Sequence, residues 1–398
     1  MLIDIHMLQN HAPSNLNRDD TGSPKDCIFG GVRRSRISSQ SIKRAIRRSK
    51  LFAVSFKENG QAVRTRQLPG EIKAIFIHRG FSEEIAEVAA VKASGFGNKE
   101  GKETGDGQTA QMMFLTPSDI LAVADILQKA YEEAGNLGNF KKIGAADLQK
   151  RADLKAWRPI TADVALFGRM ITSDAFRDVE SSIQVAHALS THKMEHEFDY
   201  FTAVDDLKEL FDSGEDKGAG MIGDVEFTSA CYYKYMSVDV DGMVDNLVGP
   251  LTAKNGIDTV ESGDALKKEA ASLARDTVLA FLQAATFSSP SGKQNTFAAH
   301  QLPDAILIEV KNHPIPVSYA NAFVMPVRVD RQSTSSDLVS KSIAALVGHV
   351  QVMDQKFSVP VVGRLWFTTR SDKLDGATEC ESFSILLEEL KKILEAHS

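Results

Sequence analysis

Hydrophobic and polar residues alternate at the start of the chain. Ile3, Ile5 and Met7 fall on one side of the alternation, and Asp4 and His6 fall on the other. A two-residue period is typical of a half-buried strand, because successive side chains point to opposite faces. We therefore predict a first strand over residues 2–8, with one face in the core and the other in solvent.

The period becomes helical after a loop at residues 10–31 that is rich in turn-forming residues. Ser38 or Ser39 can cap a helix that runs to about Lys50. An apolar stripe for the core follows the helical spacing of this segment: Ile42, Ala45 and Ile46. The remaining surface of the predicted helix carries the pairs Lys43/Arg47 and Arg44/Arg48, which lie four residues apart. Like charges at that spacing destabilise an isolated helix, so we expect a negative partner against them.

Residues 51–160 are predicted to be a helical insertion with weaker periodicity. A helix should start at Thr116, with Pro117 in its first turn and Asp119 completing a capping pair, and Gly135 lies past its end. Proline near the start and glycine after the end are typical of a helix.

The rest of the chain alternates between strand and helix patterns. Strands are predicted at residues 164–167, over Ile183, Val185 and Leu189, at 225–240 and at 305–310, and helices at 265–287 and from Phe383 to Leu394. Residues 205–223 are acidic and glycine-rich, which indicates a solvated segment. The order of strand, helix, inserted helices, strands, helix and strand is that of an α+β, ferredoxin-like domain with large insertions.

Composition excludes several classes of protein. The 398 residues are 43% hydrophobic and 25% charged, as in ordinary globular domains. No apolar run approaches the ~18 residues of a membrane helix, and we recognise no secretory signal, so we expect a cytoplasmic protein without membrane contact. Cys27, Cys231 and Cys380 form no C-x-x-C pair, which favours free thiols over a disulfide framework or a zinc finger.

The charge is distributed unevenly along the chain. The net charge is −7, yet residues 1–50 alone carry +6, and eight basic residues without an acid lie between Gly31 and Lys50. A one-sign cluster on an otherwise acidic protein indicates a phosphate-rich partner. Arginine and lysine side chains and the start of the predicted helix would donate to phosphate oxygens.

Two glycine-containing motifs lack the context that their chemistry needs. Residues 218–223, GAGMIG, match G-x-G-x-x-G but follow an acidic loop and lead into a strand, the reverse of a dinucleotide site. Ser291-Gly292-Lys293 is similar to the end of a phosphate loop, but Gln294 replaces Ser/Thr and Phe287 replaces the first glycine. We predict no ATPase and no cofactor.

Two further groups of residues are candidate metal ligands. His192, Glu195 and His196 match H-x-x-E-H, which binds zinc on a helix, but their neighbours are patterned as strand and loop. A loop cluster could hold a divalent cation for nuclease chemistry: Asp19, Asp20 and Asp26 with His11. We instead expect exposed histidines in the first group and, in the second, carboxylates paired with Arg18, Lys25 and nearby arginines. We therefore assign no metal site.

Ordered sequence blocks carry a family resemblance. They are PSNLNRDD at 13–20, KDCIFGG at 25–31, RRSRISSQSIKRAIRRS at 33–49, ALFGRMITS at 165–173, AHALSTH at 186–192, DYFTAVDDL at 199–207 and KQNTFAAH at 293–300. In that order they resemble the CasC group of the Cas-seven family, in the RAMP superfamily, which forms the backbone of the type I-E CRISPR Cascade complex. The resemblance extends to about residue 325, and residues 51–160 and the C-terminal 70 residues match poorly.

The resemblance implies a hand-shaped subunit that binds CRISPR RNA (crRNA). Its parts would be a palm with an RNA-recognition-motif core, a helical fingers domain and a thumb β-hairpin. The expected boundaries are 1–50 for the first part of the palm, 51–160 for the fingers, 161–191 for the second part of the palm, 192–225 for the thumb, and 226–398 for the palm remainder with the C-terminal helix. Copies would polymerise head to tail along the guide, kink it at regular intervals and present segments to target DNA. The other expected partners are the large, small, guide-end-capping and guide-processing Cascade subunits.

The basic stretch and the resemblance together give the predicted site. The RNA-binding residues are expected to be Arg18, Lys25, Arg34, Arg36, Ser39, Gln40, Lys43, Arg44, Arg47, Arg169 and Met170, with Met170 as a wedge at the kink. The thumb residues that displace a base are expected to be Phe201, Thr202 and Val204. A guide must be held by phosphates and sugars so that its base edges stay readable, which agrees with a surface rich in arginine and lysine.

The favoured hypothesis is a non-catalytic scaffold, and two alternatives stay open. One is a type III-like backbone subunit, in which Asp20 or Asp26 with a divalent metal cuts target RNA. The other is a zinc hydrolase built on the His192–His196 motif.

Overall fold

The computed structural model describes residues 1–55, 60–151, 154, 158–203, 221–249, 260–328 and 337–396. The chain forms two compact units. Unit 1 comprises Met1–Ser49, Gln184–Val238 and Phe281–His397, and unit 2 comprises Lys50–Ile183 and Asp239–Ala280. Each unit is described by itself below.

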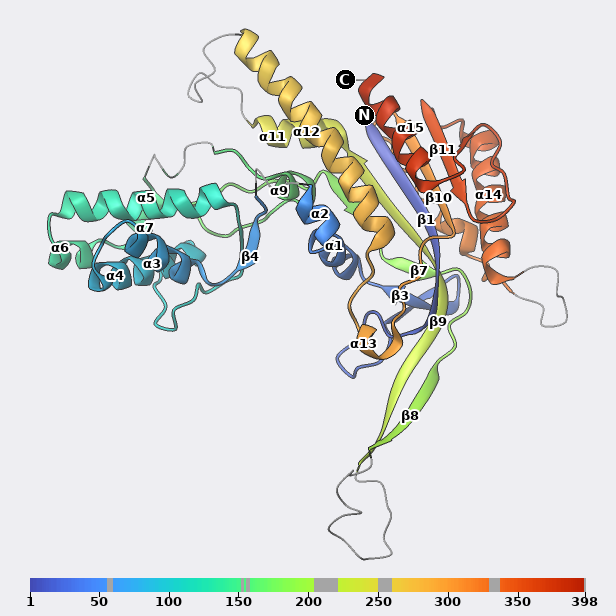
Figure 1. The fold of residues 1–398 in the computed structure, drawn as a ribbon, viewed down its shortest axis with the longest axis horizontal. Coiled ribbons are helices and arrows are strands. Elements are labelled where there is room, and N and C mark those ends of the chain that lie inside the picture. The colour runs from blue at the N-terminus through green and yellow to red at the C-terminus, as the bar shows by residue number, and fades with distance from the viewer. Residues whose placement is uncertain are drawn as a thin grey trace, which may run out of the picture. The chain divides into compact units, whose positions relative to one another are not determined.

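Unit 1 is built on a sheet whose strands come from distant parts of the sequence (Figure 1). Among the described residues, the order across the sheet is β12-β11-β10-β1-β9-β7-β3-β2, and β6 and β8 also pair with β9. The strands are β1 Leu2–Ser14, β2 Asp26–Phe29, β3 Val32–Ile37, β6 Ile183–Val185, β7 Ala188–Ser190, β8 Glu197–Ala203, β9 Met221–Asp239, β10 Ala305–Lys311, β11 Gly363–Thr368 and β12 Thr378–Glu379. β1 pairs antiparallel with β10, and β11 pairs parallel with β12.

Helices cover the sheet of unit 1. They are α1 Ser39–Arg47, α13 Gln294–Phe297, η3 Ala320–Phe323, α14 Leu338–Phe357 and α15 Phe383–Ala396. Ile343, Leu346 and Val350 of α14 pack in one core with Leu8, Leu307 and Trp366 of the sheet. The helix predicted from Phe383 to Leu394 is confirmed by α15, which buries Leu386, Leu390 and Leu394 fully.

The prediction of a half-buried first strand is wrong. β1 extends to Ser14, and Ile3, Ile5 and Met7 are as fully buried as Asp4 and His6 on the opposite face. Leu8 shares that second face and packs under α14 and η3, so both faces of β1 are covered. Buried polar groups need partners, and those of Asp4 and His6 are given below.

Unit 2 is mostly helical and has its own core. Its elements are α2 Lys50–Val54, β4 Val63–Thr65, α3 Leu68–His78, α4 Glu83–Ser94, η1 Gly95–Gly97, β5 Met113–Leu115, α5 Pro117–Ala134, α6 Leu137–Lys142, α7 Ala145–Gln149, α9 Ala162–Phe167 and α11 Val240–Val248. The helix α12 Val260–Phe287 runs from unit 2 into unit 1. Leu68, Phe76, Phe96, Leu127 and Phe140 are fully buried in one cluster.

Local sequence signals located some elements well. The α5 prediction is confirmed: Thr116 and Asp119 form a capping box, Pro117 occupies the first turn, and Gly135 has a φ of 70° at the C-cap. The 225–240, 265–287 and 305–310 predictions are also confirmed by β9, α12 and β10.

Two strand predictions are wrong. Residues 164–167 belong to the helix α9, because a short apolar run fits a buried helix as well as a strand. Residues 183–189 form two short strands, β6 and β7, instead of one. Most of the acidic 205–223 segment lies outside the described residues, and its last part, from Met221, begins β9.

Candidate nucleic-acid interface

The basic segment of unit 1 folds into β3 and α1, and the alternation of β3 separates its arginines. Arg34 is fully buried, and its guanidinium donates to the carbonyl oxygens of Ser190 (3.1 Å), Phe323 (2.8 Å) and Val324 (3.2 Å). Its burial contradicts the prediction that it binds RNA. Arg34 instead connects β3 to β7, to the end of η3 and to the residue that follows η3.

Three residues of the basic surface meet around a histidine, His187. Nδ1 of His187 accepts from the main-chain N–H of Ser39 (3.1 Å) and from Nη1 of Arg36 (3.3 Å). Burial, followed by the charges of Arg36 and Lys25, lowers the pKa of His187. Both basic side chains therefore lie close to His187. Chain connections hold them there, because the N–H of Arg36 donates to the carbonyl of Lys25 (2.8 Å). We call Lys25, Arg36, Ser39 and His187 the His187 cluster.

The helix α1 presents its charges beside this cluster. The Ser38 hydroxyl caps it by accepting from the N–H of Ser41 (3.3 Å), as the sequence predicted. Ile42 and Ile46 are buried, which confirms the predicted stripe. Gln40, Arg44 and Arg48 are exposed, and Lys43 and Arg47 are partly buried.

Arg18 lies in the loop after β1, which lines a polar depression of about 520 Å³ together with Asp19, Asp20 and Thr21. The carboxylate of Asp19 accepts from the N–H groups of Thr21 (2.9 Å) and Ser23 (3.0 Å). Asp19 therefore stabilises a turn. Its carboxylate accepts from main-chain N–H groups instead of forming the expected pair with a basic residue. The N–H of Lys25 donates to the carbonyl of Asn17 (2.9 Å), which connects this loop to the His187 cluster.

Asp26 and His11, which the sequence grouped with Asp19 and Asp20 as candidate metal ligands, have partners of their own. Asp26 pairs with Arg33, as expected for a carboxylate beside a basic segment. His11 is fully buried, and burial followed by the charge of Lys234 lowers its pKa to about 3. His11 is thus a neutral core residue, and the four residues do not form one site.

The H-x-x-E-H motif is not on a helix. Residues 193–196 are irregular and precede β8. His192 is partly buried, its Nδ1 lies 2.8 Å from the carbonyl oxygen of Lys193, and burial lowers its pKa. His196 contacts the carboxylate of Glu226. The two histidines therefore have different protein partners, and the expectation of two solvent-exposed histidines is wrong for His192.

Arg169 and Met170, both predicted to bind RNA, lie in unit 2, and the structure gives them different surroundings: Arg169 is buried and Met170 is exposed. Arg169 is 8% exposed, and its guanidinium contacts the buried carboxylate of Asp119. Burial alone would raise the pKa of Asp119, but Arg169 and the capping hydrogen bonds hold it below its usual value. Arg169 is not available to bind RNA, which contradicts that prediction.

Met170, in contrast, is 89% exposed. It follows Gly168, whose φ is 69° and where a Cβ atom would lie 2.7 Å from the nitrogen of Ser181. Arg169 exchanges main-chain hydrogen bonds with Val179 (2.9 Å each). Gly168 and Arg169 thus fix a rigid turn that holds an apolar side chain in solvent.

β8 and β9 form a hairpin that projects from the sheet of unit 1 (Figure 1). Phe201 pairs with Gly223, where a Cβ atom would lie 2.6 Å from the Phe201 ring, and Thr202 pairs with Ile222. Several large apolar side chains of the hairpin are exposed: Phe198, Tyr200, Phe201, Met221 and Ile222. Val204 lies outside the described residues.

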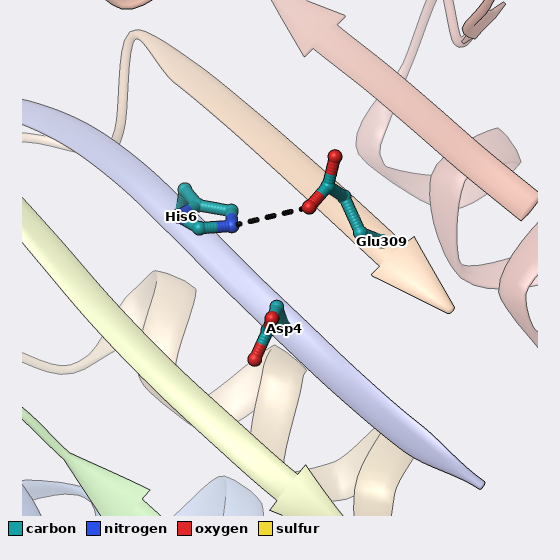
Figure 2. Close-up of side chains that lie close together, drawn as sticks. All are labelled: Asp4, His6 and Glu309. Carbon is teal, nitrogen blue, oxygen red and sulfur yellow. Dashed lines mark ion pairs between the residues drawn. The ribbon is translucent and has the colours of Figure 1, made fainter. Parts of the chain in front are cut away.

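A buried polar cluster in unit 1 has the residue types of a metal site (Figure 2). Asp4 and His6 of β1 lie beside Glu309 of β10, and Nε2 of His6 is 3.9 Å from the Glu309 carboxylate. The protein itself supplies cations to both carboxylates, however. Nζ of Lys311 is 2.6 Å from Asp4 and 3.5 Å from Glu309, and Arg364 is 2.6 Å from Glu309.

Tyrosines complete this cluster. Tyr235 donates to Asp4 (2.9 Å), Tyr319 donates to Glu309 (3.0 Å), and the Tyr233 hydroxyl is 2.8 Å from Nδ1 of His6. Burial is the main cause that lowers the pKa of His6 to about 4. The cluster is therefore a charge-balanced core network rather than a metal centre, and the sequence pattern gave no signal of it.

Comparisons with known proteins agree with one family. A model of the CT1975-like protein family, a family of Cas proteins, matches residues 3–392. The chain belongs to this family. A solved chain of a "CRISPR RNA-guided surveillance complex, pre-nicking" has a TM-score of 0.77 and 27% identity, over 99% of this chain and 100% of that one.

A second solved chain has the same fold as this protein. It comes from a "CRISPR RNA-guided surveillance complex" and has a TM-score of 0.69 and 23% identity, over 99% of this chain and 100% of that one. The large mixed sheet and the α+β class are therefore shared with subunits of such complexes. A search of curated protein sequences found no match. None of the helices in the described part of the chain is long and apolar enough to cross a membrane.

Proposed function

We propose that the chain is the crRNA-binding backbone subunit of a type I CRISPR surveillance complex, of the I-E Cascade type. Family membership and the 27% identical solved chain support the backbone role. The observation that carries RNA binding is the His187 cluster, where Lys25, Arg36 and the first N–H of α1 surround one histidine. Lysine and arginine side chains gathered in this way bind phosphate without reading bases.

The proposed RNA surface follows from exposure. It comprises Arg18, Lys25, Arg36, Ser39, Gln40, Lys43, Arg44 and Arg47 of unit 1. Arg34 and Arg169 are omitted because their guanidinium groups are buried on protein acceptors. Met170 remains the proposed wedge, since an 89% exposed methionine on a rigid turn is unexplained by packing.

The hand-shaped division is proposed with its sequence boundaries unchanged. Residues 1–50, 161–191 and 226–398 would form a ferredoxin-like palm, residues 51–160 the helical fingers and residues 192–225 the thumb. The projecting β8–β9 hairpin with its exposed aromatic side chains supports the thumb assignment. Phe201 and Thr202 lie on that hairpin, and we keep them with Val204 as the residues that displace a base.

We propose that copies polymerise head to tail along the guide. A heterologous interface that does not close generates such a filament, and the exposed hairpin offers an apolar surface for a neighbouring copy. The guide would be kinked at intervals and would pair with target DNA between the kinks. The large, small, guide-end-capping and guide-processing subunits would complete the complex in the cytoplasm.

We propose that the subunit is a scaffold without catalytic, metal or cofactor sites. The type III-like alternative needs Asp20 or Asp26 beside a divalent ion. Asp26 is paired with Arg33 and lies 4.0 Å from His196, so its nearest partners are basic groups. Magnesium-dependent cuts in complementary RNA, lost in Asp26→Ala, would favour the alternative.

A charge-reversal experiment tests the proposal. Lys25→Glu combined with Lys43→Glu should remove most RNA from the purified assembly, because two phosphate donors become repulsive. The matched control is Lys373→Glu combined with Lys391→Glu, two exposed lysines on other parts of unit 1. Equal RNA content per subunit in both double variants would contradict the proposed surface.

A further inference from the structure

A depression of about 370 Å³ lies on unit 1 beside α1. One wall is the helix face that carries Arg44 and Arg48, together with Ser41. The other wall is the segment Ser289–Gly292, and Leu16 also lines the depression. We call this the Arg44–Arg48 depression.

Its two arginines create an unbalanced positive charge. Arg44 and Arg48 lie four residues apart on one helix face, and both are exposed. Within the described ranges, neither guanidinium makes an ion pair with a carboxylate. Asp19 and Asp20 line a different depression, which shares Leu16 and Gly292 with this one. Like charges at this spacing repel, so an anion between them would be stabilised.

The opposite wall is held in place by a close backbone contact. A Cβ atom on Gly292 would lie 2.4 Å from the carbonyl oxygen of Leu16 and 2.6 Å from that of Asn15. Only glycine allows this approach. The segment is therefore packed tightly on the end of β1 and the following loop, and it forms a fixed wall.

This wall carries donors that the protein does not use. In the part of the chain that the structure describes, the main-chain N–H groups of Ser291 and Gly292 have no hydrogen-bond acceptor. The hydroxyls of Ser289 and Ser291 lie on the same segment. Guanidinium groups, hydroxyls and free N–H groups are the donors that bind phosphate oxygens.

We propose that the Arg44–Arg48 depression binds a backbone phosphate of a nucleic acid. The phosphate lies between the two guanidinium groups and is closed on its other side by the Ser289–Gly292 segment. This gives a role to Ser291 and Gly292, the first two residues of the Ser291-Gly292-Lys293 motif, outside the context of an ATPase. The identity of the strand rests on the proposed function, and it is either the guide RNA or the target strand.

The test uses the RNA-loaded assembly with Arg44→Gln and Arg48→Gln combined. The control is Lys373→Gln with Lys391→Gln, which removes the same charge elsewhere on unit 1. Two quantities are measured over a salt series: the fraction of guide RNA retained without target, and the dissociation constant for complementary DNA. Neutralising one phosphate contributes about 0.7 to the slope of log affinity against log salt for a single strand.

The two sources of phosphate predict different results. If the phosphate belongs to the guide, the double variant loses guide at lower salt than the control does. If it belongs to the target, guide retention matches the control, and the target affinity falls about tenfold with a slope shallower by about 0.7. A double variant that matches the control in both measurements would overturn the inference.

A single substitution on the opposite wall, and inorganic phosphate as a probe, test the depression without relying on the proposed function. Ser291→Ala should give a weaker effect in the same measurement as the double variant. Inorganic phosphate titrated into the RNA-free full chain should bind, and binding should be lost in the double variant only. A wild-type assembly without RNA would refute the proposed function, whereas absent phosphate binding would refute this inference.

Discussion

Some charged residues in this protein stabilise the fold and are not available at the surface. Arg34 and Arg169 lie in the most basic or most family-specific blocks, yet both are buried on protein acceptors. Sequence patterns could not separate them from their exposed neighbours, because strand alternation tells which side chains share a face but not which face is covered. Burial therefore decides which arginines can meet RNA.

Arg169→Ala should destabilise the protein in the absence of RNA. It removes a cation from the buried carboxylate of Asp119, and among the described residues Arg158 (3.3 Å) is then the remaining basic partner. Breaking a buried pair in this way costs about 3 kcal/mol, measured as the free energy of unfolding in urea. Met170→Ala, at the exposed neighbouring position, should change it by less than about 0.5 kcal/mol. Equal stabilities of the two variants would contradict the buried role of Arg169.

Acid should destabilise unit 1 through its buried histidines. The pKa values of His6 and His11 are lowered to about 4 and about 3, below the unfolded value of 6.5. The unfolded state thus binds protons first, so the stability present above pH 6.5 is lost as the pH falls. Each histidine contributes about 3 kcal/mol of this loss by pH 4.

The comparison is between wild type and His11→Gln, with unfolding free energies measured from pH 7 to pH 4. The wild-type curve should fall more steeply by about 3 kcal/mol over that range. The control is His313→Gln, which removes an exposed histidine of unit 1. Parallel curves for wild type and His11→Gln would show that His11 does not titrate as a buried group.

At the scale of elements, local signals worked where a cap or a long period was present. The capping box of α5, the stripe of α1 and the helix α15 were predicted from the sequence, and the structure confirms them. The short apolar run of α9 and the covered second face of β1 were not, because both depend on what packs against them. His187 was also missed, since its importance comes from Arg36 and Ser39 meeting it in space.

The β8–β9 hairpin should act in assembly rather than in folding. Tyr200 and Ile222 are 75% and 73% exposed, so Tyr200→Ser with Ile222→Ser should leave the free energy of unfolding within about 0.5 kcal/mol of wild type. The same variant should reduce the number of subunits per RNA, measured by analytical ultracentrifugation. Phe357→Ser, which changes a 68% exposed residue of α14, is the control. Normal assembly of the hairpin variant would contradict the thumb role.

At the scale of the whole molecule, the charge is distributed unevenly. The basic N-terminal segment lies on a protein whose remaining residues carry −13, and we expect this contrast to direct nucleic acid to the basic surface. A scaffold that holds phosphates must bind guides of different sequence equally, and its affinity must fall with salt.

Salt dependence should therefore separate the proposed surface from a generic basic patch. Lys25→Glu with Lys43→Glu should make the slope of log affinity against log salt shallower by about 1.4, because two single-strand phosphate contacts are lost. Two guides of equal length and different sequence should give the same affinity in filter binding. A sequence-dependent affinity, or an unchanged slope in the variant, would argue against phosphate contacts at Lys25 and Lys43.

The most direct test of the central claim is the identity of the RNA that the protein carries in cells. The tagged chain is purified together with the products of neighbouring genes, and its nucleic acid is extracted and sequenced. The account predicts RNA of uniform length, flanked by CRISPR repeat sequence and retained at moderate salt. Recovery of no RNA, or of random RNA that moderate salt removes, would contradict it.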